Sequence, residues 1–401
     1  MALDWLIIGG GIHGVHIAAR LIEDADVAPE KLRIVDPNRS LLDRWRARTA
    51  ATGMTHLRSP AVHNLDVSPW ALMDFAENHK HHTQDLFAPP YNRPSLQLFN
   101  QHCNELIEDL ELEKIHIRAR AVSCKATCSG VEVSLCNGTE LSTANIVLAL
   151  GSSEQPLWPK WAPAGDPRVS HIFESPSIEL PTNEKSVLVV GGGISAGQVA
   201  LRLMKEGRQV HLVARHKLRE HQFDSDPGWL GPKYMDGFTK EMDHDQRRKL
   251  ITSARNSGSM SPDVLRALKK AFSRRKVHWH EDAVTRVDTQ DHTLAIHLKS
   301  GDELNVQRVL LATGFAPDRP GGALVEKLVR SASLPCAGCG YPIVDQTLRW
   351  HSGVYVSGPL AELTLGPSAR NISGARRAAD RLVAVARATQ SSPIGIQPSS
   401  L

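Results

Sequence analysis

Residues 187–203 read VLVVGGGISAGQVALRL, an apolar run that enters three glycines and continues with apolar residues at helical spacing. Such a strand, turn and helix can cradle a nucleotide, but any close connection between a strand and a helix also favours small residues. One loop of this kind is therefore weak evidence. Evidence from the rest of the sequence is needed to distinguish nucleotide binding from tight packing of the strand against the helix.

The N-terminus repeats the same pattern, with an apolar strand that leads into GGGIHG at residues 9–14. The glycines fit G-x-G-x-x-G. Gly9 permits the tight turn, Gly11 lets the backbone approach a pyrophosphate, and Gly14 allows the helix to lie close to the strand. A second strand, KLRIVDPN, reaches Asp36 about 20 residues later, where a dinucleotide fold places the carboxylate that binds the ribose hydroxyls.

The opening stretch supplies all the same parts. Gly191 and Gly193 take the first two glycine positions, and Ala196 takes the third. Its second strand, QVHLVAR, ends on Arg215, where a guanidinium can pair with a 2′-phosphate, and Lys217 adds positive charge nearby. This copy is therefore predicted to bind NADPH rather than NADH. Two complete copies favour nucleotide binding over tight packing at both loops.

Two further segments resemble each other. Residues 145–159 (NIVLALGSSEQPLWP) and 307–320 (QRVLLATGFAPDRP) each run from an apolar strand through a glycine into a loop marked by proline. Each is expected to close its own nucleotide-binding unit, with a small residue that lets the chain pass near the cofactor. An ordinary strand terminus gives the same pattern, so neither segment decides the matter alone.

Taken together, GGGIHG with Asp36, LALGSSEQP, GGGISA with Arg215 and LLATGFAP resemble the two-dinucleotide flavoproteins. The resemblance is greatest to the flavin-containing and N-hydroxylating monooxygenases, which include the lysine and ornithine N-hydroxylases. It implies that the first loop binds FAD and the second binds NADPH. It also implies that NADPH reduces the flavin, that oxygen adds to the flavin C4a carbon, and that the resulting hydroperoxide oxygenates a nucleophilic nitrogen or sulfur, or a ketone.

Two departures from the family pattern indicate which branch of these monooxygenases the chain resembles. The fingerprint F-x-G-x-x-x-H-x-x-x-W/F is absent, since VSHIFE offers His171 while Pro167 stands where glycine is needed. The first of the Ala-Thr-Gly positions reads Ala149, Leu150, Gly151. These departures argue against the Baeyer–Villiger and drug-metabolising branches of the family and favour the N-hydroxylase-like branch.

The C-terminal stretch HSGVYVSGPLAELTLGPSARNISGARRAADRL also resembles these flavoproteins. A strand over 354–357 leads to Gly358, and Gly366 with the following proline is expected to open a final helix that returns to the FAD domain. In the family this helix N-terminus faces the flavin, so Leu365 and Gly366 are interpreted as flavin-adjacent and Asn371 as a further candidate. A packing helix with proline in its first turn is the alternative.

The resemblance thus implies two sets of cofactor contacts. The FAD set is Gly9, Gly11, Gly14, Asp36, Gly151, Gly358, Leu365 and Gly366. The NADPH set is Gly191, Gly193, Ser195, Ala196, Arg215, Lys217 and Gly314.

Residues 54–70, MTHLRSPAVHNLDVSPW, occupy the place where the family lays a loop under the isoalloxazine ring. Arg58 and His56 are the catalytic candidates in this loop. Arg58 would stabilise the peroxyflavin or hold NADP⁺, and His56 would touch the ring. An arginine that pairs with a carboxylate in a loop made rigid by prolines explains the pattern equally well.

The expected fold class is α/β, with two Rossmann-like ββα dinucleotide-binding domains and parallel sheets. The FAD domain is discontinuous because its final strand must rejoin the first unit, and the NADPH domain is inserted into it. The predicted boundaries are 1–165 and 310–401 for the FAD domain and 166–309 for the NADPH domain.

Within the NADPH domain, residues from about 217 to 276 are expected to form an insertion of aromatic loops followed by two helical segments. Trp229, Tyr234 and Phe238 either line a substrate pocket or anchor the insertion, and the sequence leaves both interpretations open.

Two charged patterns have plain explanations. HKHH at residues 79–82 invites a metal site, but neighbouring positions do not converge as i, i+4 pairs do, so a solvated polar turn and no metal are expected. KKAFSRRK at residues 269–276 is basic, but it ends a helix that Ser261 and Pro262 open, where cations complement the helix dipole.

Cys336 and Cys339 form a C-x-x-C, which keeps a second class of enzyme open, a pyridine nucleotide-disulfide oxidoreductase. Related reductases carry their redox pair just after the first dinucleotide loop or inside the NADPH domain. Here residues 1–102 and 137–335 contain no cysteine. A structural role is favoured for the pair, and a peripheral redox role stays open.

Composition adds limits on partners and location. The 401 residues suggest two or three domains, and a net charge of +4 commits the chain to neither nucleic acid nor membrane. The N-terminus lacks a secretory signal, and no apolar stretch approaches the roughly 20 residues that span a bilayer. A cytoplasmic protein with reduced cysteines is expected, with a small-molecule substrate and O₂ as partners and its oligomeric state open.

Overall fold

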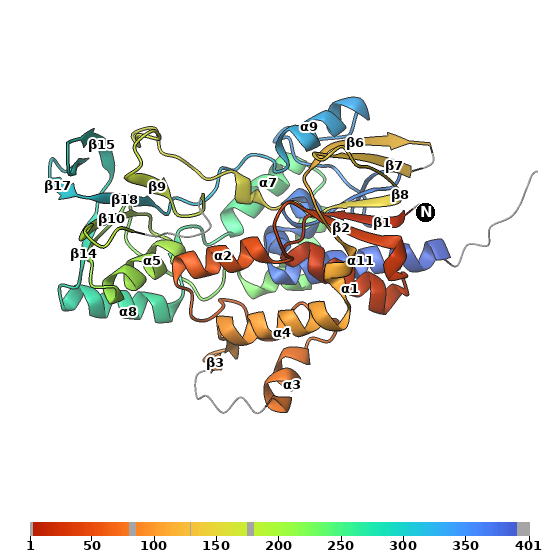
Figure 1. The fold of residues 1–401 in the computed structure, drawn as a ribbon, viewed down its shortest axis with the longest axis horizontal. Helices are drawn as coiled ribbons and strands as arrows, with labels where there is room; N and C mark the ends of the chain where they lie inside the picture. Colours follow the sequence, from red (N-terminus) through yellow and green to blue (C-terminus); the bar gives the residue numbers. More distant parts are fainter. Residues whose placement is uncertain (1–2, 80–85, 129, 175–179, 391–401) are drawn as a thin grey trace, which may run out of the picture.

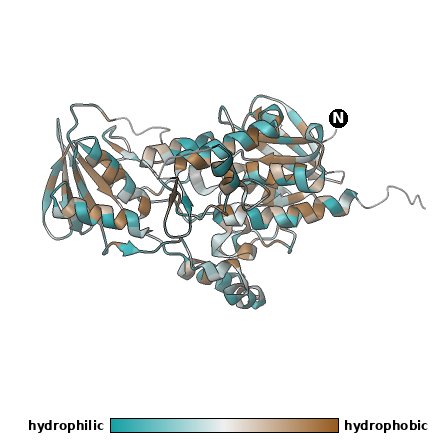
Figure 2. Cartoon of the chain, turned by 90° about the horizontal axis from the view of Figure 1, so that it is seen from below, coloured by the Kyte–Doolittle hydropathy of each residue, from teal (hydrophilic) through white to brown (hydrophobic). Residues whose placement is uncertain are grey.

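The structure, a computed structural model, describes residues 3–79, 86–128, 130–174 and 180–390. Two sheets lie at opposite ends of its long axis, each flanked by helices (Figure 1). The second sheet is wholly parallel, and the first has a parallel centre with antiparallel strands added at β7 and β19. Figure 2 shows hydrophobic residues concentrated on the strands of both sheets, while hydrophobic and hydrophilic residues alternate along the helices. The expected α/β class with parallel sheets is confirmed. None of the helices in the described ranges combines the length and apolar composition that crossing a bilayer requires.

The first sheet is built from both ends of the chain. Its strands follow the order β19-β20-β8-β1-β2-β5, β7 pairs antiparallel with β8, and β6 pairs antiparallel with β7. The strands are β1 (Leu3–Ile8), β2 (Leu32–Asp36), β5 (His116–Arg118), β6 (Ala121–Thr127), β7 (Gly130–Leu135), β8 (Glu140–Leu148), β19 (Arg349–His351) and β20 (Val354–Val356). Because β20 pairs with β8 in parallel, the C-terminal part of the chain returns to the first unit.

Helices cover both faces of this sheet because its central strands are apolar on both sides. On β1, Ile7 packs toward α1 and α11, and Leu6 packs toward α9. Arg387 near the end of α11 donates to the carbonyl of Asp24 at 2.6 Å, which holds the last helix beside the first. The helices of this half are α1 (Ile12–Ala25), α2 (Asp43–Thr52), α3 (Ala71–Asn78), α4 (Leu96–Asp109), α9 (Gly322–Ser331), α10 (Glu362–Leu365) and α11 (Ile372–Gln390), and the short strands β3 (Phe87–Ala88) and β4 (Arg93–Pro94) lie beside α4.

The second sheet is a five-stranded parallel sheet in the order β14-β11-β10-β18-β9. Val189 of β10 packs toward α5 and α8, and Leu188 packs toward the β15-β16-β17 meander. The elements are β9 (Val169–His171), β10 (Ser186–Val190), α5 (Ile194–Lys205), β11 (Gln209–Ala214), α8 (Pro262–Ser273), β14 (Val277–Glu281), β15 (Val284–Thr289), β16 (Leu294–Leu298), β17 (Glu303–Val306) and β18 (Arg308–Leu311).

Two linkers join the halves and bond to each other. Leu157 donates to the carbonyl of Gly314 at 3.0 Å, and Ala316 donates to the carbonyl of Gln155 at 2.8 Å. The predicted boundary at residue 310 falls inside β18, whose pairing with β10 continues to Leu311. The second sheet therefore extends slightly past that boundary.

Two local expectations differ from the structure. Between the halves lie α6 (Pro232–Lys240), α7 (His244–Ala254) and the short strands β12 (Arg219–Glu220) and β13 (Ser259–Met260), so the insertion contains three helices with α8 rather than two. A proline in the first turn and the buried Met235 and Phe238 make α6 helical where an aromatic loop was expected. The final helix begins at Ile372, because a short 3₁₀ turn intervenes after Gly366.

Candidate cofactor and active site

The first glycine loop has three positions with different steric demands. Gly9 has φ of 116°, and a Cβ placed there would lie 2.5 Å from the carbonyl oxygen of Ala149. A Cβ on Gly14 would lie 1.8 Å from the carbonyl oxygen of Gly9, whereas one on Gly11 would meet no atom within 4 Å. The fold therefore requires glycine at the outer two positions. At Gly11 the structure leaves open space that a phosphate group can use.

Both helices that follow the glycine loops have N-termini suited to an anion. Gly11 is the N-cap residue of α1 and Gly193 that of α5, and neither residue can supply a side-chain cap. The first turns also contain no acidic residue. The first backbone N–H groups and the positive end of each helix dipole are thus available to phosphates.

The second glycine loop repeats the geometry of the first. A Cβ on Gly191, at φ of 149°, would lie 2.4 Å from the carbonyl oxygen of Ala312. The N–H of Gly191 donates to Val213 at 2.9 Å, as that of Gly9 donates to Val35 at 2.9 Å. In each half the residue just after a central strand thus lies against the first glycine, Ala149 after β8 and Ala312 after β18. This explains why residues 145–159 and 307–320 resemble each other.

Asp36 ends β2 beside the first glycine loop, with 9% of its surface exposed. Its carboxylate accepts from the Gly10 N–H at 2.8 Å, and its other oxygen accepts from the Asn38 N–H at 2.9 Å and the Asn38 amide at 2.6 Å. Each carboxylate oxygen keeps acceptor capacity, because ionised carboxylates offer about four lone-pair sites. Sequence reasoning missed Asn38.

A pocket of about 670 Å³ adjoins this strand end and is lined by Asn38, Asp43, Arg44, Arg46, Ala47, Arg48, Glu154, Pro156, Phe173 and Glu174. Arg44 and Arg120 each lie 3.0 Å from Glu154. Burial raises the pKa of Glu154, but these two guanidinium groups lower it by more, so the pKa is lowered overall. Arg48 lies 5.4 Å from the ring centres of both Phe173 and Phe315, which is cation–π distance. Glu154 and Pro156 belong to the segment at 145–159, but no sequence motif pointed to the residues of α2 that line this pocket.

Charged residues of the second half reach solvent where a 2′-phosphate is expected. Arg215 and Lys217 are exposed at the end of β11. Within the described ranges neither forms an ion pair with an acidic side chain. Between them, the His216 ring packs on Gly192 and Gly258. Ala196 is buried in the first turns of α5, and Ser195 is half-buried beside it.

His13 lies at the centre of the first site. Its Nδ1 is 2.8 Å from Ser357 Oγ, while its Nε2 is buried and has no hydrogen-bond partner in the described part of the chain. Burial lowers the pKa of His13 to about 4, opposed by the nearby backbone of Arg370 and Asn371. Those two residues precede α11, so the glycine loop, the Ser357 turn and the last helix meet at this ring. Sequence reasoning missed His13 inside the motif that it quoted.

The flavin-adjacent candidates lie under the insertion. Gly358 has φ of 64° and faces the His13 ring, and Leu365 is buried. A Cβ on Gly366, at φ of 78°, would lie 3.1 Å from Met235 Sδ and 3.7 Å from the Trp229 ring. The insertion therefore covers the segment that the sequence assigned to the flavin.

Of the three aromatic candidates in the insertion, Phe238 is 1% exposed and packs with Tyr341 and Leu363 of the C-terminal segment. Trp229 lies against Phe238 and Tyr234, with ring centres 5.8 Å and 5.3 Å away. Phe238 thus anchors the insertion, and Trp229 lies at the edge of the candidate site.

Arg58 spans from the loop at 54–70 to the insertion. Its guanidinium donates to the carbonyls of His221 at 2.6 Å, Gln222 at 2.8 Å and Phe223 at 3.0 Å. Burial lowers the pKa of Arg58. The Asp224 carboxylate also lies 3.9 Å from Nη1, so the hydrogen bonds to the insertion engage Nε and Nη2, and Nη1 has this longer ion pair. His56 pairs with Ser95 in an isolated β-bridge.

A buried carboxylate fastens the insertion further. Glu362 of α10 is fully buried and contacts Arg370, Arg248 at 2.8 Å and Arg255 at 3.5 Å. Burial raises the pKa of Glu362, but hydrogen bonds and charge from Arg370 and Arg248 outweigh it, so the pKa is lowered. Arg255 also contacts Asp224 at 2.7 Å. Charged groups of α7 and its C-terminal neighbours thus meet the C-terminal segment.

The remaining sequence candidates stay apart from this site. His79 contacts Glu105 at 3.2 Å, whereas Lys80, His81 and His82 lie outside the described residues. In the described ranges no group of three His, Cys, Asp or Glu side chains is arranged to hold a metal. Ser261 precedes α8 and Pro262 opens it, as the sequence predicted.

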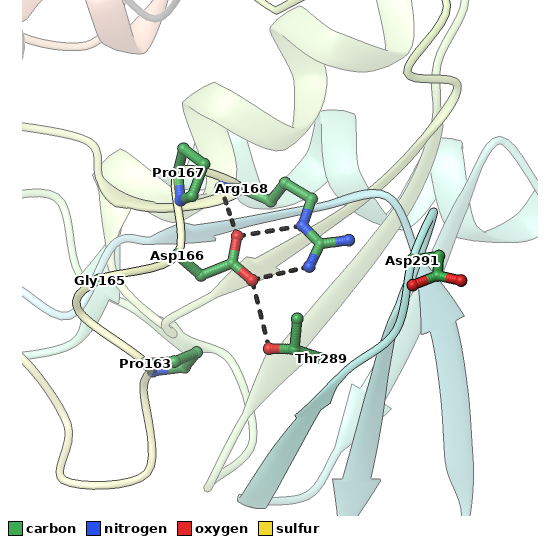
Figure 3. Close-up of a pocket in the computed structure, with 7 residues that line it drawn as sticks. All are labelled: Pro163, Gly165, Asp166, Pro167, Arg168, Thr289 and Asp291. Atoms are coloured by element: carbon green, nitrogen blue, oxygen red, sulfur yellow. Dashed lines mark hydrogen bonds and ion pairs between the residues drawn. The ribbon is translucent and has the colours of Figure 1, made fainter.

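A second hollow, of about 620 Å³, lies between the 163–168 loop and the meander (Figure 3). Arg168 contacts the Asp166 carboxylate at 2.8 Å, and the Thr289 hydroxyl donates to it at 3.2 Å. The polar groups converge on each other rather than on the open space. This cluster therefore serves as a structural ion pair.

Comparisons with known proteins agree with this geometry. A family model described as FAD-NAD(P)-binding matches residues 6–153, and one described as pyridine nucleotide-disulphide oxidoreductase matches residues 247–381. A search of curated proteins finds no match.

Solved structures align over almost the whole chain. Ornithine hydroxylase from Pseudomonas aeruginosa has 17% identity and a TM-score of 0.77, covering 98% of this chain and 100% of that one. Ornithine N-hydroxylase from Kutzneria sp. 744 has 16% identity and a TM-score of 0.78, with the same coverage. Bacillithiol disulfide reductase from Staphylococcus aureus has 15% identity and a TM-score of 0.65, again with 98% and 100% covered. The two-dinucleotide flavoprotein fold is confirmed, and at these identities the likeness establishes the fold alone.

Proposed function

We propose that this chain is a cytoplasmic, FAD- and NADPH-dependent monooxygenase that oxygenates a small substrate at a nucleophilic nitrogen or sulfur. The observation that carries the proposal is the pair of matching glycine loops, one on each sheet, in a fold that aligns end to end with ornithine N-hydroxylases. The aligned Kutzneria structure holds reduced FAD, NADP⁺ and L-ornithine.

The residues of the first half fit FAD. The open space at Gly11 accepts a diphosphate, the carboxylate of Asp36 has capacity for ribose hydroxyls, and the buried Nε2 of His13 lacks a partner that a cofactor would supply. Bound FAD would accept a hydride from NADPH and activate dioxygen. We include Gly9, Gly14, Gly151, Gly358, Leu365 and Gly366 in the proposed FAD site.

The residues of the second half fit NADPH. Gly193 and the N-terminus of α5 would bind the diphosphate, and Arg215 with Lys217 would bind the 2′-phosphate. Gly191, Ser195, Ala196 and Gly314 complete the proposed site. This division corresponds to an FAD domain at 1–165 and 310–401 and an NADPH domain at 166–309, with the second sheet extending through Leu311.

The chain itself would position the reactants and exclude water. The helix dipole of α11 points its positive end toward the His13 turn, where it would stabilise negative charge on a reduced ring. The insertion, held by Arg58 and by the Glu362 cluster, covers the Gly366 segment and so would limit solvent access. Arg58 enters this proposal as a positioning residue, and the assignment of His56 to the flavin surroundings stays a prediction.

One observation favours a second function, NAD(P)H-dependent reduction of a disulfide. The pyridine nucleotide-disulphide oxidoreductase model matches residues 247–381, which include Cys336 and Cys339, and the fold also aligns with a bacillithiol disulfide reductase. The two functions differ in what oxidises the reduced flavin.

The deciding experiment measures NADPH oxidation by the FAD-loaded protein with labelled dioxygen and a panel of primary amines, including ornithine and lysine, and thioethers. A monooxygenase consumes NADPH faster with its substrate and transfers one labelled oxygen atom to it. The proposal is wrong if no nucleophile changes NADPH consumption or carries label, while small disulfides speed NADPH consumption in the absence of oxygen.

A further inference from the structure

The C-x-x-C pair lies in one tight hairpin at the junction of several segments. Ile343 donates to the carbonyl of Pro335 at 3.0 Å, and Ala337 donates to that of Tyr341 at 2.9 Å. Gly340 donates back to Ala337 at 2.8 Å and has φ of 79°. The loop that these bonds close holds both cysteines three positions apart. Their thiols are free and partly exposed.

The Cys336 thiol has a guanidinium beside it. Arg319 Nη1 donates to Cys336 Sγ at 3.4 Å and to the Gly340 carbonyl at 2.9 Å. The pKa of Cys336 is raised overall, because burial outweighs the lowering effect of Arg319. A neighbouring cation favours the thiolate, which is the form that reacts with oxidants.

The same hairpin connects the insertion to a linker. Tyr341 donates from its hydroxyl to the Pro317 carbonyl at 3.0 Å, and the Arg248 guanidinium lies 3.9 Å from its ring centre. A Cβ on Gly338 would lie 3.0 Å from Asp245 Oδ2 of α7. Arg248 also belongs to the Glu362 cluster. A change at the thiols would therefore act directly on the attachment of α7.

We propose that Cys336 and Cys339 form a reversible disulfide under peroxide, and that this modification weakens the attachment of α7 to the hairpin. The thiolate of one cysteine attacks the O–O bond of hydrogen peroxide, which gives a sulfenic acid and water after proton transfer. The second thiol displaces water from the sulfenic acid and forms the S–S bond. In total, two thiols and one peroxide give one disulfide and two waters.

The disulfide changes the contacts of the hairpin with Arg319 and with α7. A disulfide sulfur cannot become a thiolate, so Arg319 loses an anionic acceptor at Cys336, and closing the S–S bond moves the Gly338 backbone that packs on Asp245 of α7. A flavoenzyme that reduces dioxygen without a substrate releases hydrogen peroxide, so a local source of the oxidant rests on the proposed function. The thiol chemistry itself does not rest on it, because peroxide can be added directly.

The test uses the full-length protein, reduced and then exposed to hydrogen peroxide, followed by alkylation and peptide mass spectrometry. We expect a linked Cys336–Cys339 peptide that dithiothreitol reverses, and faster backbone hydrogen exchange in α7 of the oxidised protein. Cys339→Ser should show neither effect, whereas Cys128→Ser, at an exposed site on the meander of the first sheet, should keep both. The wild-type measurements need no variant, so a poorly folded substitution would not obscure the result.

Three results would overturn the proposal. One is that both thiols stay reduced, and are therefore fully alkylated, after a peroxide treatment strong enough to oxidise the exposed Cys128. Another is a linked peptide with unchanged exchange in α7, which would remove the proposed effect on the insertion. The third is loss of NADPH-driven disulfide reduction in Cys339→Ser, which would make the pair catalytic. None of these depends on the substrate panel, so failure here and failure of the proposed monooxygenase are separate outcomes.

Discussion

Gly11→Ala separates the cofactor function of the first loop from its role in the fold. Gly11 has φ of −83° and ψ of −168°, which alanine adopts freely, and its new Cβ would meet no protein atom within 4 Å. The free energy of unfolding of the protein without cofactor should therefore stay unchanged or rise by about 0.4–1 kcal/mol. A bound diphosphate, however, would lose its close approach to the backbone.

The expected cost is at least one hydrogen bond between a backbone N–H and a charged phosphate, about 1.5–3 kcal/mol. This corresponds to a rise in the Kd for FAD of about tenfold to more than a hundredfold. Fluorescence titration of the apoprotein with FAD measures the Kd, and urea unfolding measures stability.

Two glycine substitutions serve as controls. Gly165→Ala adds a Cβ that also meets no atom within 4 Å, but far from the glycine loop, so it should affect stability as Gly11→Ala does and leave the Kd for FAD unchanged. Gly14→Ala would place a Cβ 1.8 Å from the Gly9 carbonyl oxygen and should damage the fold itself. A stable Gly11→Ala protein with an unchanged Kd for FAD would refute the assignment of this loop.

Three other predictions follow from charged and titratable groups. Arg215→Ala should raise the KM for NADPH by about tenfold to a hundredfold and leave that for NADH unchanged, and equal KM values for both nucleotides in the wild type would contradict the assignment. Glu362→Gln leaves three guanidinium groups without their buried carboxylate, so thermal and urea unfolding should show a loss of about 3–5 kcal/mol, against at most about 1 kcal/mol for Glu111→Gln in a surface pair. His16 is fully buried, and burial lowers its pKa to about 3, so only the unfolded chain gains this proton as the pH falls below 6.5. Its contribution to the free energy of unfolding should fall by about 2 kcal/mol between about pH 7 and pH 5, and His16→Gln should flatten this part of the pH profile.

The sequence by itself determined the features that depend on local backbone demands. The positions of Gly9 and Gly14 could be read directly, because their conformation and close contacts are requirements of a single strand-turn-helix unit. The same holds for Asp36 at the end of β2. The strand-turn-helix unit occurs twice in the sequence, and its two copies predicted both sheets. The return of the C-terminal strand to the first sheet was also predicted correctly.

Only the tertiary structure decided how segments far apart in the chain meet. The sequence left the role of Arg58 open between catalysis and structure. Its partners, the carbonyls at 221–223, lie far along the chain, and no local pattern predicts them. His13 stood inside a recognised motif, but its importance comes from Ser357, which lies more than three hundred positions away. The extra helix α6 and the later start of α11 follow the burial of apolar side chains between distant elements. Such contacts depend on how the whole chain packs, so they cannot be predicted from the spacing of motifs or from amino-acid composition.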